Sequence, residues 1–359
     1  MTLTLIAVQL TASAYSPRVV DVFRNNRDMR ILLGSYAISI FYGLIVLKLM
    51  KGIEGEVMSH SVTLPFGHGS IPFEYFVSFA LWLGAFTFVA LFPYMLSIID
   101  LLKPVNIIKR LSEDITIDKI SNYIEKTLKG VETSTVEDPV QPIVDIIYGA
   151  LGKHDLETTR KGLRGIVELV IKVINTEEKE KKEGKISFYS GYICNHLQQV
   201  GKFAASIEDE ESTREAILYL EKFGIYIVKQ DLKEATEQVV LSLRAVGEAA
   251  ADNGLKDATE QAALSLGIVG EAAADKDLED ATWQAALSLE AVGEVAADKG
   301  LKKATMEVAT SLGTIGEAAA REELQEVTEQ VILSLRAVGE AAADKGLKDA
   351  AMEAATSLE

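Results

Sequence analysis

Cysteine, histidine and basic residues are scarce in this chain of 359 residues. Cys194 is the single cysteine, so the chain forms no disulfide within itself and offers no cysteine cluster for zinc. Lysine and arginine total 36 against 53 aspartates and glutamates, and the acidic surplus lies almost entirely beyond residue 103. Because an acidic surface repels phosphates, this balance argues against nucleic-acid binding.

Patterns of catalytic residues are scarce as well. His60 and His68 share a predicted loop with two glutamates, but their spacing fits no metal template. Cys194 and His196 are two residues apart, and two such side chains on a helix do not face each other. The chain also lacks a glycine-rich phosphate loop. We therefore expect no enzyme, no metal and no cofactor.

Two long apolar stretches occupy much of the first 103 residues. Residues 31–50 carry one charge, Lys48, and the second stretch, about residues 74–99, carries none from Phe76 to Ile99. A bilayer core of about 30 Å needs about 20 apolar residues, so both stretches are predicted to be transmembrane helices. Basic residues flank the pair on its outer sides more than in the connecting loop. The positive-inside rule then places both ends in the cytoplasm of a multi-pass inner-membrane protein.

A shorter apolar segment, residues 1–16, precedes the first stretch and carries no charge. Its polar side chains Thr2, Gln9, Ser13 and Ser16 recur near helical intervals. A glutamine inside a bilayer is costly unless it is hydrogen-bonded. Gln9 therefore indicates either packing between membrane helices or a water-filled path through an oligomer.

Two further groups near the first stretch have alternative interpretations. Ser35, Ser39 and Gly43 form a stripe of small residues at four-residue steps, which favours close helix packing within the chain or between copies. Four arginines are interpreted as ligands of anionic lipid headgroups, or as the inner mouth of a pore. These are Arg18, Arg24, Arg27 and Arg30.

The membrane segment resembles a known family. The residues that carry the resemblance are Leu3–Leu10, Tyr15–Arg18, Leu33 with Gly34, and Tyr42–Leu47. Over residues 3–103 they are similar to the predicted prokaryotic membrane proteins called domain of unknown function 2254. An Asn-Asp-Pro motif of that family survives only as Asp138-Pro139. The resemblance implies an inner-membrane location and two further helices upstream, but no established activity.

A repeat of 23 residues runs through the C-terminal part of the chain. Glycines recur at this interval from Gly201 to Gly339, and the sequences around most of them are nearly identical. Ser-Leu-Arg or Ser-Leu-Glu alternates with Ser-Leu-Gly, so two helix types form a hairpin of 46 residues, close to the HEAT type. We predict an all-α fold with a two-layer solenoid over residues 186–359. A helical connector at 104–175 and a charged linker at 176–185 precede it.

The turns of the repeat have their own signals. Gly254, Gly300 and Gly346 are predicted to end helices in the left-handed conformation. Asp257 and Glu260 fit a capping box at the start of the next helix. We interpret the glycines that recur every 23 residues as punctuation between helices.

The favoured function is an oligomeric ion channel or transport-related pore. Two or three spans in one chain cannot easily enclose a path, so the pore requires several copies around an axis. The alternative is a membrane-anchored scaffold whose acidic solenoid binds protein partners. Either function makes the lipid bilayer a partner, and the pore also requires a homo-oligomer.

Overall fold

The computed structural model describes residues 27–51, 61–63, 70–101, 103–128, 138–179 and 183–358. Several side chains singled out in the sequence lie outside these ranges: Thr2, Gln9, Ser13, Ser16, Arg18, Arg24, His60 and His68. The chain divides into two compact units, Met1–Ile107 and Ile108–Glu359. Each unit is described by itself.

The first unit contains a pair of long helices. Helix α3 (Arg27–Lys51) packs against α4 (Phe73–Leu101), and both predicted apolar stretches fall within these helices. Strands β1 (Ser61–Thr63) and β2 (Ser70–Pro72) pair antiparallel between them, with Val62 opposite Ile71. The chain therefore reverses direction between the two helices.

Tyrosines join the two helices. The Tyr36 hydroxyl donates to the Thr87 carbonyl at 3.0 Å, and the Tyr42 hydroxyl donates to the Phe76 carbonyl at 3.3 Å. The Tyr42 ring also meets the Phe79 ring edge to face, with centroids 5.3 Å apart. These contacts leave many large apolar side chains of both helices exposed. No helix in the described part of the chain qualifies, by length and apolarity together, as a membrane span.

The second unit is built from helices, beginning at the boundary with α5. Their bounds in chain order are α5 (Pro104–Asp114), α6 (Ile117–Leu128), α7 (Gln141–Leu151), α8 (Leu156–Lys179), α9 (Glu183–Ser206), α10 (Glu210–Lys229), α11 (Lys233–Asp252), α12 (Lys256–Ala274), α13 (Glu279–Asp298), α14 (Lys302–Arg321), α15 (Gln325–Asp344) and α16 (Lys348–Thr356). Helix continues through most of the predicted linker 176–185, because its glutamates and lysines are good helix formers.

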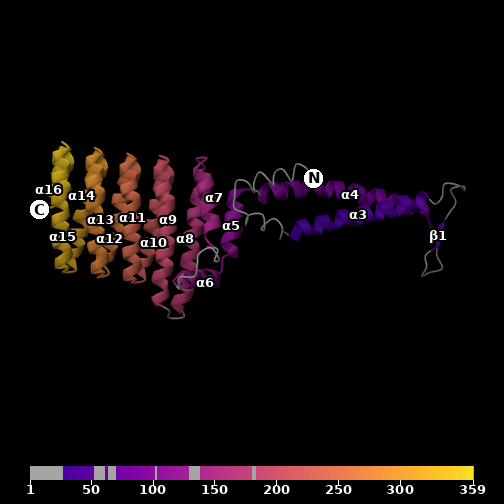
Figure 1. Cartoon of the computed structure of the whole chain (residues 1–359), viewed down its shortest axis with the longest axis horizontal. Helices are drawn as coiled ribbons and strands as arrows, with labels where there is room; N and C mark the ends of the chain where they lie inside the picture. The colour runs from indigo at the N-terminus through magenta and orange to yellow at the C-terminus, as the bar shows by residue number, and fades with distance from the viewer. Residues whose placement is uncertain are drawn as a thin grey trace. The chain divides into compact units, whose positions relative to one another are not determined.

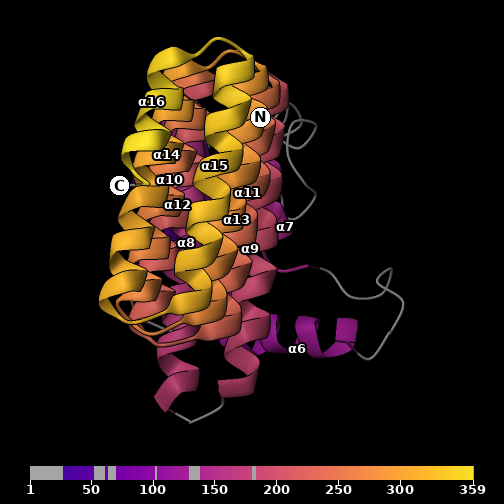
Figure 2. The same cartoon turned by 90° about the vertical axis from the view of Figure 1, so that its left-hand side faces the viewer.

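The helices form two layers (Figures 1 and 2). From α7 to α14, each helix packs on its neighbour in the chain and also on the helix after that. Helices α9, α11, α13 and α15 make the layer called the odd layer, and α10, α12, α14 and α16 make the even layer. This arrangement confirms the all-α helical-repeat fold. The same packing also includes α8, which precedes residue 186.

The predicted left-handed turns are confirmed. Gly254 and Gly300 have φ of 71°, and Gly346 has φ of 73°. In the turns that lack glycine, Asp277 and Glu323 adopt the same conformation, with φ of 56° and 59°. Both types of turn therefore follow one path, although a left-handed conformation is costly for a residue with a side chain.

The predicted capping box is wrong. Helix α12 starts after Leu255, which is its N-cap residue. A leucine side chain cannot accept a capping hydrogen bond, and this one is buried in the core instead. The Thr259 hydroxyl donates back to the Leu255 carbonyl at 2.7 Å. Asp257 lies exposed in the first turn, and the Glu210 carboxylate of α10 accepts its backbone N–H at 2.7 Å. A neighbouring helix of the same layer thus supplies the cap.

The interpretation of the 23-residue glycines as punctuation is also wrong. Gly247 lies inside α11, and a Cβ atom there would sit 2.9 Å from the Ala262 Cβ and 3.1 Å from a methyl group of Val292. Gly293 in α13 lies equally close to the next two helices, where a Cβ atom would meet methyl groups of Val308 and Val338. These glycines allow one helix to approach both the next helix and the one after it.

Buried serines face the residue that follows the leucine of Ser-Leu, or of Tyr-Leu in α10, in the preceding helix of the same layer. The Ser265 hydroxyl donates to Glu221 of α10 at 2.6 Å, and Ser334 donates to Glu290 of α13 at 2.6 Å. Where glycine replaces the acceptor, as at Gly267, a Cβ atom would lie 2.6 Å from the serine hydroxyl of the next helix in the layer. Glycine at this place therefore leaves room for the serine of the next helix in the layer.

Candidate functional site

The small-residue stripe lies on a half-buried face of α3. Ser35, Ser39 and Gly43 are all half-buried. A methyl group at Gly43 would meet no atom of the described residues within 4 Å, so packing of α3 on α4 does not require glycine there. Arg27 and Arg30 belong to the first turn of α3, and their side chains lie outside the described part of the structure.

Cys194 and His196 have separate surroundings in α9. Burial raises the pKa of the Cys194 thiol to about 12, although a hydrogen bond with Ser242 opposes the rise. The thiol is therefore neutral at physiological pH and a poor nucleophile. His196 is also buried and approaches Asp138 instead.

Asp138 joins the start of α7 to α9. Its Oδ1 accepts the backbone N–H groups of Val140 at 2.8 Å and Gln141 at 3.1 Å, and it also accepts the Tyr192 hydroxyl. Its Oδ2 lies 3.1 Å from Nε2 of His196, at angles that fall short of a hydrogen bond. The carboxylate thus caps α7 and holds it against two side chains of α9.

Electrostatics keep this carboxyl ionised. Burial raises the pKa of Asp138, but the approach of His196 and the Tyr192 hydroxyl outweigh burial and lower it overall. The same carboxylate, added to burial, raises the pKa of Tyr192. Nδ1 of His196 is buried without a hydrogen-bond partner among the described residues. The ring therefore has one polar edge that the cluster leaves unused.

A cavity of about 380 Å³ opens beside this cluster. Helix α6 contributes Tyr123, whose ring centroid is 5.5 Å from that of Tyr192. Aromatic and amide side chains make up most of the remaining wall, and they are Phe188, Gln141, Asn195 and Gln199. Aromatic and amide walls suit a planar polar molecule.

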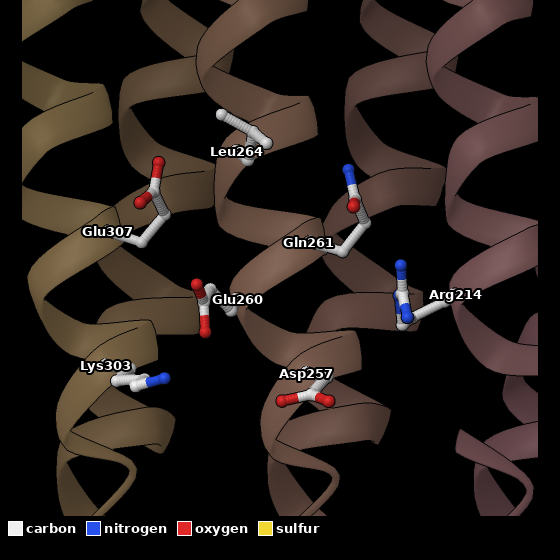
Figure 3. Close-up of a pocket in the computed structure, with 7 residues that line it drawn as sticks. All are labelled: Arg214, Asp257, Glu260, Gln261, Leu264, Lys303 and Glu307. Atoms are coloured by element: carbon white, nitrogen blue, oxygen red, sulfur yellow. The ribbon is translucent and has the colours of Figure 1, made fainter. Parts of the chain in front are cut away.

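A second hollow lies on the even layer (Figure 3). It holds about 290 Å³ between α10, α12 and α14. Figure 3 shows the carboxylates of Glu260 and Glu307 on neighbouring helices, with the Lys303 ammonium turned toward the same space. Burial and the charge of Glu260 raise the pKa of Glu307. Arg214 and Asp257 complete the mixture of charges, which is typical of a solvated polar surface.

The N-terminal part of the chain has a family match. Residues 1–145 match the model of a family described as "Predicted membrane protein (DUF2254)". Residues 1–145, which are similar to this family, are called the DUF2254 segment below. The match confirms the resemblance predicted from the first 103 residues and extends it into α7. Asp138 therefore lies inside the DUF2254 segment, whereas Tyr192 and His196 lie in the repeats that follow it.

Solved structures with some likeness to the chain are helical-repeat proteins and filaments. One is titled "Circular tandem repeat protein with novel repeat topology and enhanced subunit contact surfaces", with 13% identity, a TM-score of 0.37, and coverage of 95% of this chain and 85% of that one. The designed helical repeat protein DHR64 has 16% identity, a TM-score of 0.33, and coverage of 68% and 98%. The DHF46 filament has 16% identity, a TM-score of 0.38, and coverage of 47% and 94%. No curated protein matches the chain.

The sequence singled out only part of the Asp138 cluster. Asp138 was noticed as a remnant of a family motif, and His196 was considered only as a partner for Cys194. The two residues are 58 positions apart, and no local pattern joins them. The one available signal is the place of His196 in the repeat, because α10 has a tyrosine there and the five helices from α11 to α15 have a serine.

Proposed function

We propose that this protein is a membrane-anchored scaffold. In this proposal α3 and α4 cross the inner membrane, and the helical repeats bind protein partners in the cytoplasm. It assigns the protein no catalytic activity and no nucleic-acid partner. The lipid bilayer is its first partner.

Two observations support the membrane anchor. The DUF2254 segment includes both helices and is described as a membrane protein. Large apolar side chains are also exposed on both helices, among them Phe41 at 68%, Leu81 at 71% and Trp82 at 66%. Exposing such an apolar surface to water is unfavourable in free energy, whereas contact with lipid tails is not. Exposed Lys103, Lys109 and Arg110 after α4 support the cytoplasmic side for the repeats.

The regular two-layer stack carries the scaffold proposal. Buried positions of the repeat hold the same small set of residues in each helix, so the core alone accounts for the fold. The outward positions then form extended surfaces on which side chains recur every second helix. Surfaces of this kind bind protein partners in other helical-repeat folds.

An oligomeric ion channel or transport pore is the second candidate. The open space beside Gly43 favours it, since a second copy fits against a small-residue stripe. The residues predicted to line the path, Gln9 above all, lie outside the described part of the chain. The scaffold therefore has more support from the described residues.

Ion flux separates the two candidates. The full chain is reconstituted into liposomes, and flux is measured for the wild type, Gln9→Leu and the control Gln261→Leu, which changes a glutamine of the repeats. The scaffold predicts flux no greater than in protein-free liposomes for all three, together with flotation on lipid at high salt. Flux that Gln9→Leu alters and Gln261→Leu does not would overturn the scaffold in favour of the pore. Failure to float with lipid would remove the membrane anchor.

A further inference from the structure

The odd layer carries an apolar band across its outer face. The places of the repeat are counted from the N-cap residue of each helix, which is the first place and is a leucine in α11, α13 and α15. The tenth place is a leucine in these three helices as well. Leu241 is 43% exposed and Leu333 is 54% exposed. One turn later each helix has a half-buried alanine. These three helices stand side by side in one layer (Figure 1), so the side chains line up from helix to helix. We call this surface the leucine band: Leu241, Ala245, Leu287, Ala291, Leu333 and Ala337.

Acidic side chains border the leucine band on both sides. Toward the helix N-termini these are Glu234, Glu237, Asp280, Glu326 and Glu329. Toward the C-termini they are Glu248, Glu294 and Glu340. Burial, together with the charges of Asp280 and Glu234, raises the pKa of Glu237, as expected where carboxylates crowd.

Two arginines reduce this negative charge only in part. Arg244 forms an ion pair with Glu248 on its own helix, at 2.8 Å. Arg336 is exposed in α15 at the same place of the repeat. The acidic side chains along the two borders outnumber these arginines, so the surroundings of the leucine band attract cations.

Trp283 adds an aromatic ring to one border. It occupies the sixth place of the repeat in α13, where α11 and α15 have Glu237 and Glu329. Its side chain is 40% exposed. An exposed tryptophan beside apolar side chains is typical of the centre of a protein interface.

The even layer does not repeat this surface. Its tenth places are Leu218 and Leu264 in α10 and α12, but threonine in α14 and α16. Lys222 and Thr314 break the row one turn later. Both layers share the same buried positions, so the fold itself does not require a continuous apolar band on one face only.

We propose that the leucine band docks an amphipathic segment of a partner protein whose apolar ridge has lysine or arginine on both sides. This inference rests on the proposed scaffold function and names its partner surface. The apolar ridge matches the leucines, and the basic flanks match the two acidic borders. Helices packed about 8–10 Å apart place Leu241 and Leu333 about 20 Å from each other. A helix of about 14 residues covers that length, at about 1.5 Å per residue.

The probe is a fluorescein-labelled synthetic helix of about 14 residues with a leucine ridge and lysines on both flanks. The protein is the full chain in nanodiscs of zwitterionic lipid, with empty nanodiscs as the blank. Two tryptophans occur in the chain, so Trp82→Phe leaves Trp283 as the only one and makes its fluorescence a local reporter. A second peptide with glutamate in place of lysine tests the charge.

Matched variants locate the surface. Leu241→Lys and Leu264→Lys change leucines at the same place of the repeat, 43% and 40% exposed, on opposite layers. Loss of one buried leucine contact and addition of a positive charge should weaken binding of the basic peptide about 10-fold or more for Leu241→Lys. Leu264→Lys should stay within about 2-fold of wild type. Thermal unfolding of each variant shows whether the repeats remain folded, and Leu333→Lys repeats the test in a different helix.

The expected result is binding of the lysine peptide, a change in Trp283 emission, and loss with Leu241→Lys or Leu333→Lys only. Absence of binding to wild type, equal binding of the glutamate peptide, or equal weakening by Leu264→Lys would overturn the leucine band. None of these results touches the scaffold itself, which the flux and flotation measurements test without any peptide. A pore found by those measurements would overturn the scaffold even if the peptide binds.

Discussion

Gly293→Ala tests the close approach of the repeat helices. In an exposed helix this change stabilises the protein by about 1 kcal/mol, because alanine is the better helix former. In α13 the added Cβ atom would lie 2.8 Å from a methyl group of Val308 and 2.9 Å from one of Val338. The two valines belong to α14 and α15, so a shift of α13 away from one does not relieve the other.

The expected sign is therefore reversed. Overpacking in a core costs about 1–3 kcal/mol, which exceeds the helix-propensity gain of about 1 kcal/mol. We expect Gly293→Ala to lower the free energy of unfolding by about 1 kcal/mol, measured from urea denaturation followed by far-UV circular dichroism. Gly191→Ala in α9 is the control, because its Cβ atom would meet only the flexible Gln238 amide at 3.4 Å. That variant should be as stable as wild type or more so.

A double-mutant cycle checks the cause. Val308→Ala removes one of the two clashing side chains, so its combination with Gly293→Ala should cost less than the sum of the single changes. If Gly293→Ala proves as stable as Gly191→Ala, the reasoning about close packing is refuted. Simple additivity of Gly293→Ala and Val308→Ala would refute the assignment to that contact.

Three further predictions concern single side chains. Glu323→Gly should raise the free energy of unfolding by about 1 kcal/mol and Gly300→Ala should lower it by a similar amount, both by urea denaturation, because each turn residue has a positive φ. Asp138→Asn should destabilise the protein at neutral pH. Since the folded pKa of Asp138 is lowered, its contribution is present above the unfolded pKa near 3.9 and is lost as the pH falls through the folded pKa, so unfolding midpoints of variant and wild type should converge in acid. Ser334→Ala should cost about 1 kcal/mol by urea denaturation, whereas Ser288→Ala should cost less, because only the Ser334 hydroxyl has a hydrogen-bond partner in the described part of the chain.

The period of the repeat was sufficient to predict the helices and their two layers. Glycines 23 residues apart and the alternation of Ser-Leu-Gly with Ser-Leu-Arg predict a hairpin of 46 residues, because a pattern that repeats at twice the basic period indicates two alternating helix types. The left-handed turns at Gly254 and Gly300 were predictable for the same reason. A positive φ has a local signature that a single sequence reveals.

Contacts between helices were not predictable in this way. The period shows that a glycine recurs at the place of Gly247, but it does not show which neighbouring atoms surround that place, so the interpretation as punctuation was wrong. The capping box failed because a local pattern at Asp257 competes with burial of Leu255, and burial of the leucine determines where the helix starts. Asp138 and His196 come from different parts of the chain, and only the packing of α7 on α9 brings them together.

The two layers offer an internal comparison that separates folding from function. Odd and even helices share the same buried threonine, serine and alanine positions, so stability alone would allow the same outer side chains on both. The outer faces nevertheless differ: leucine and alanine continue across α11, α13 and α15, while threonine and lysine interrupt the row on the even layer. Exposed leucines add little to the stability of a helix surface and raise the tendency to associate. Their continuity on one layer is therefore the observation that supports the proposed docking surface.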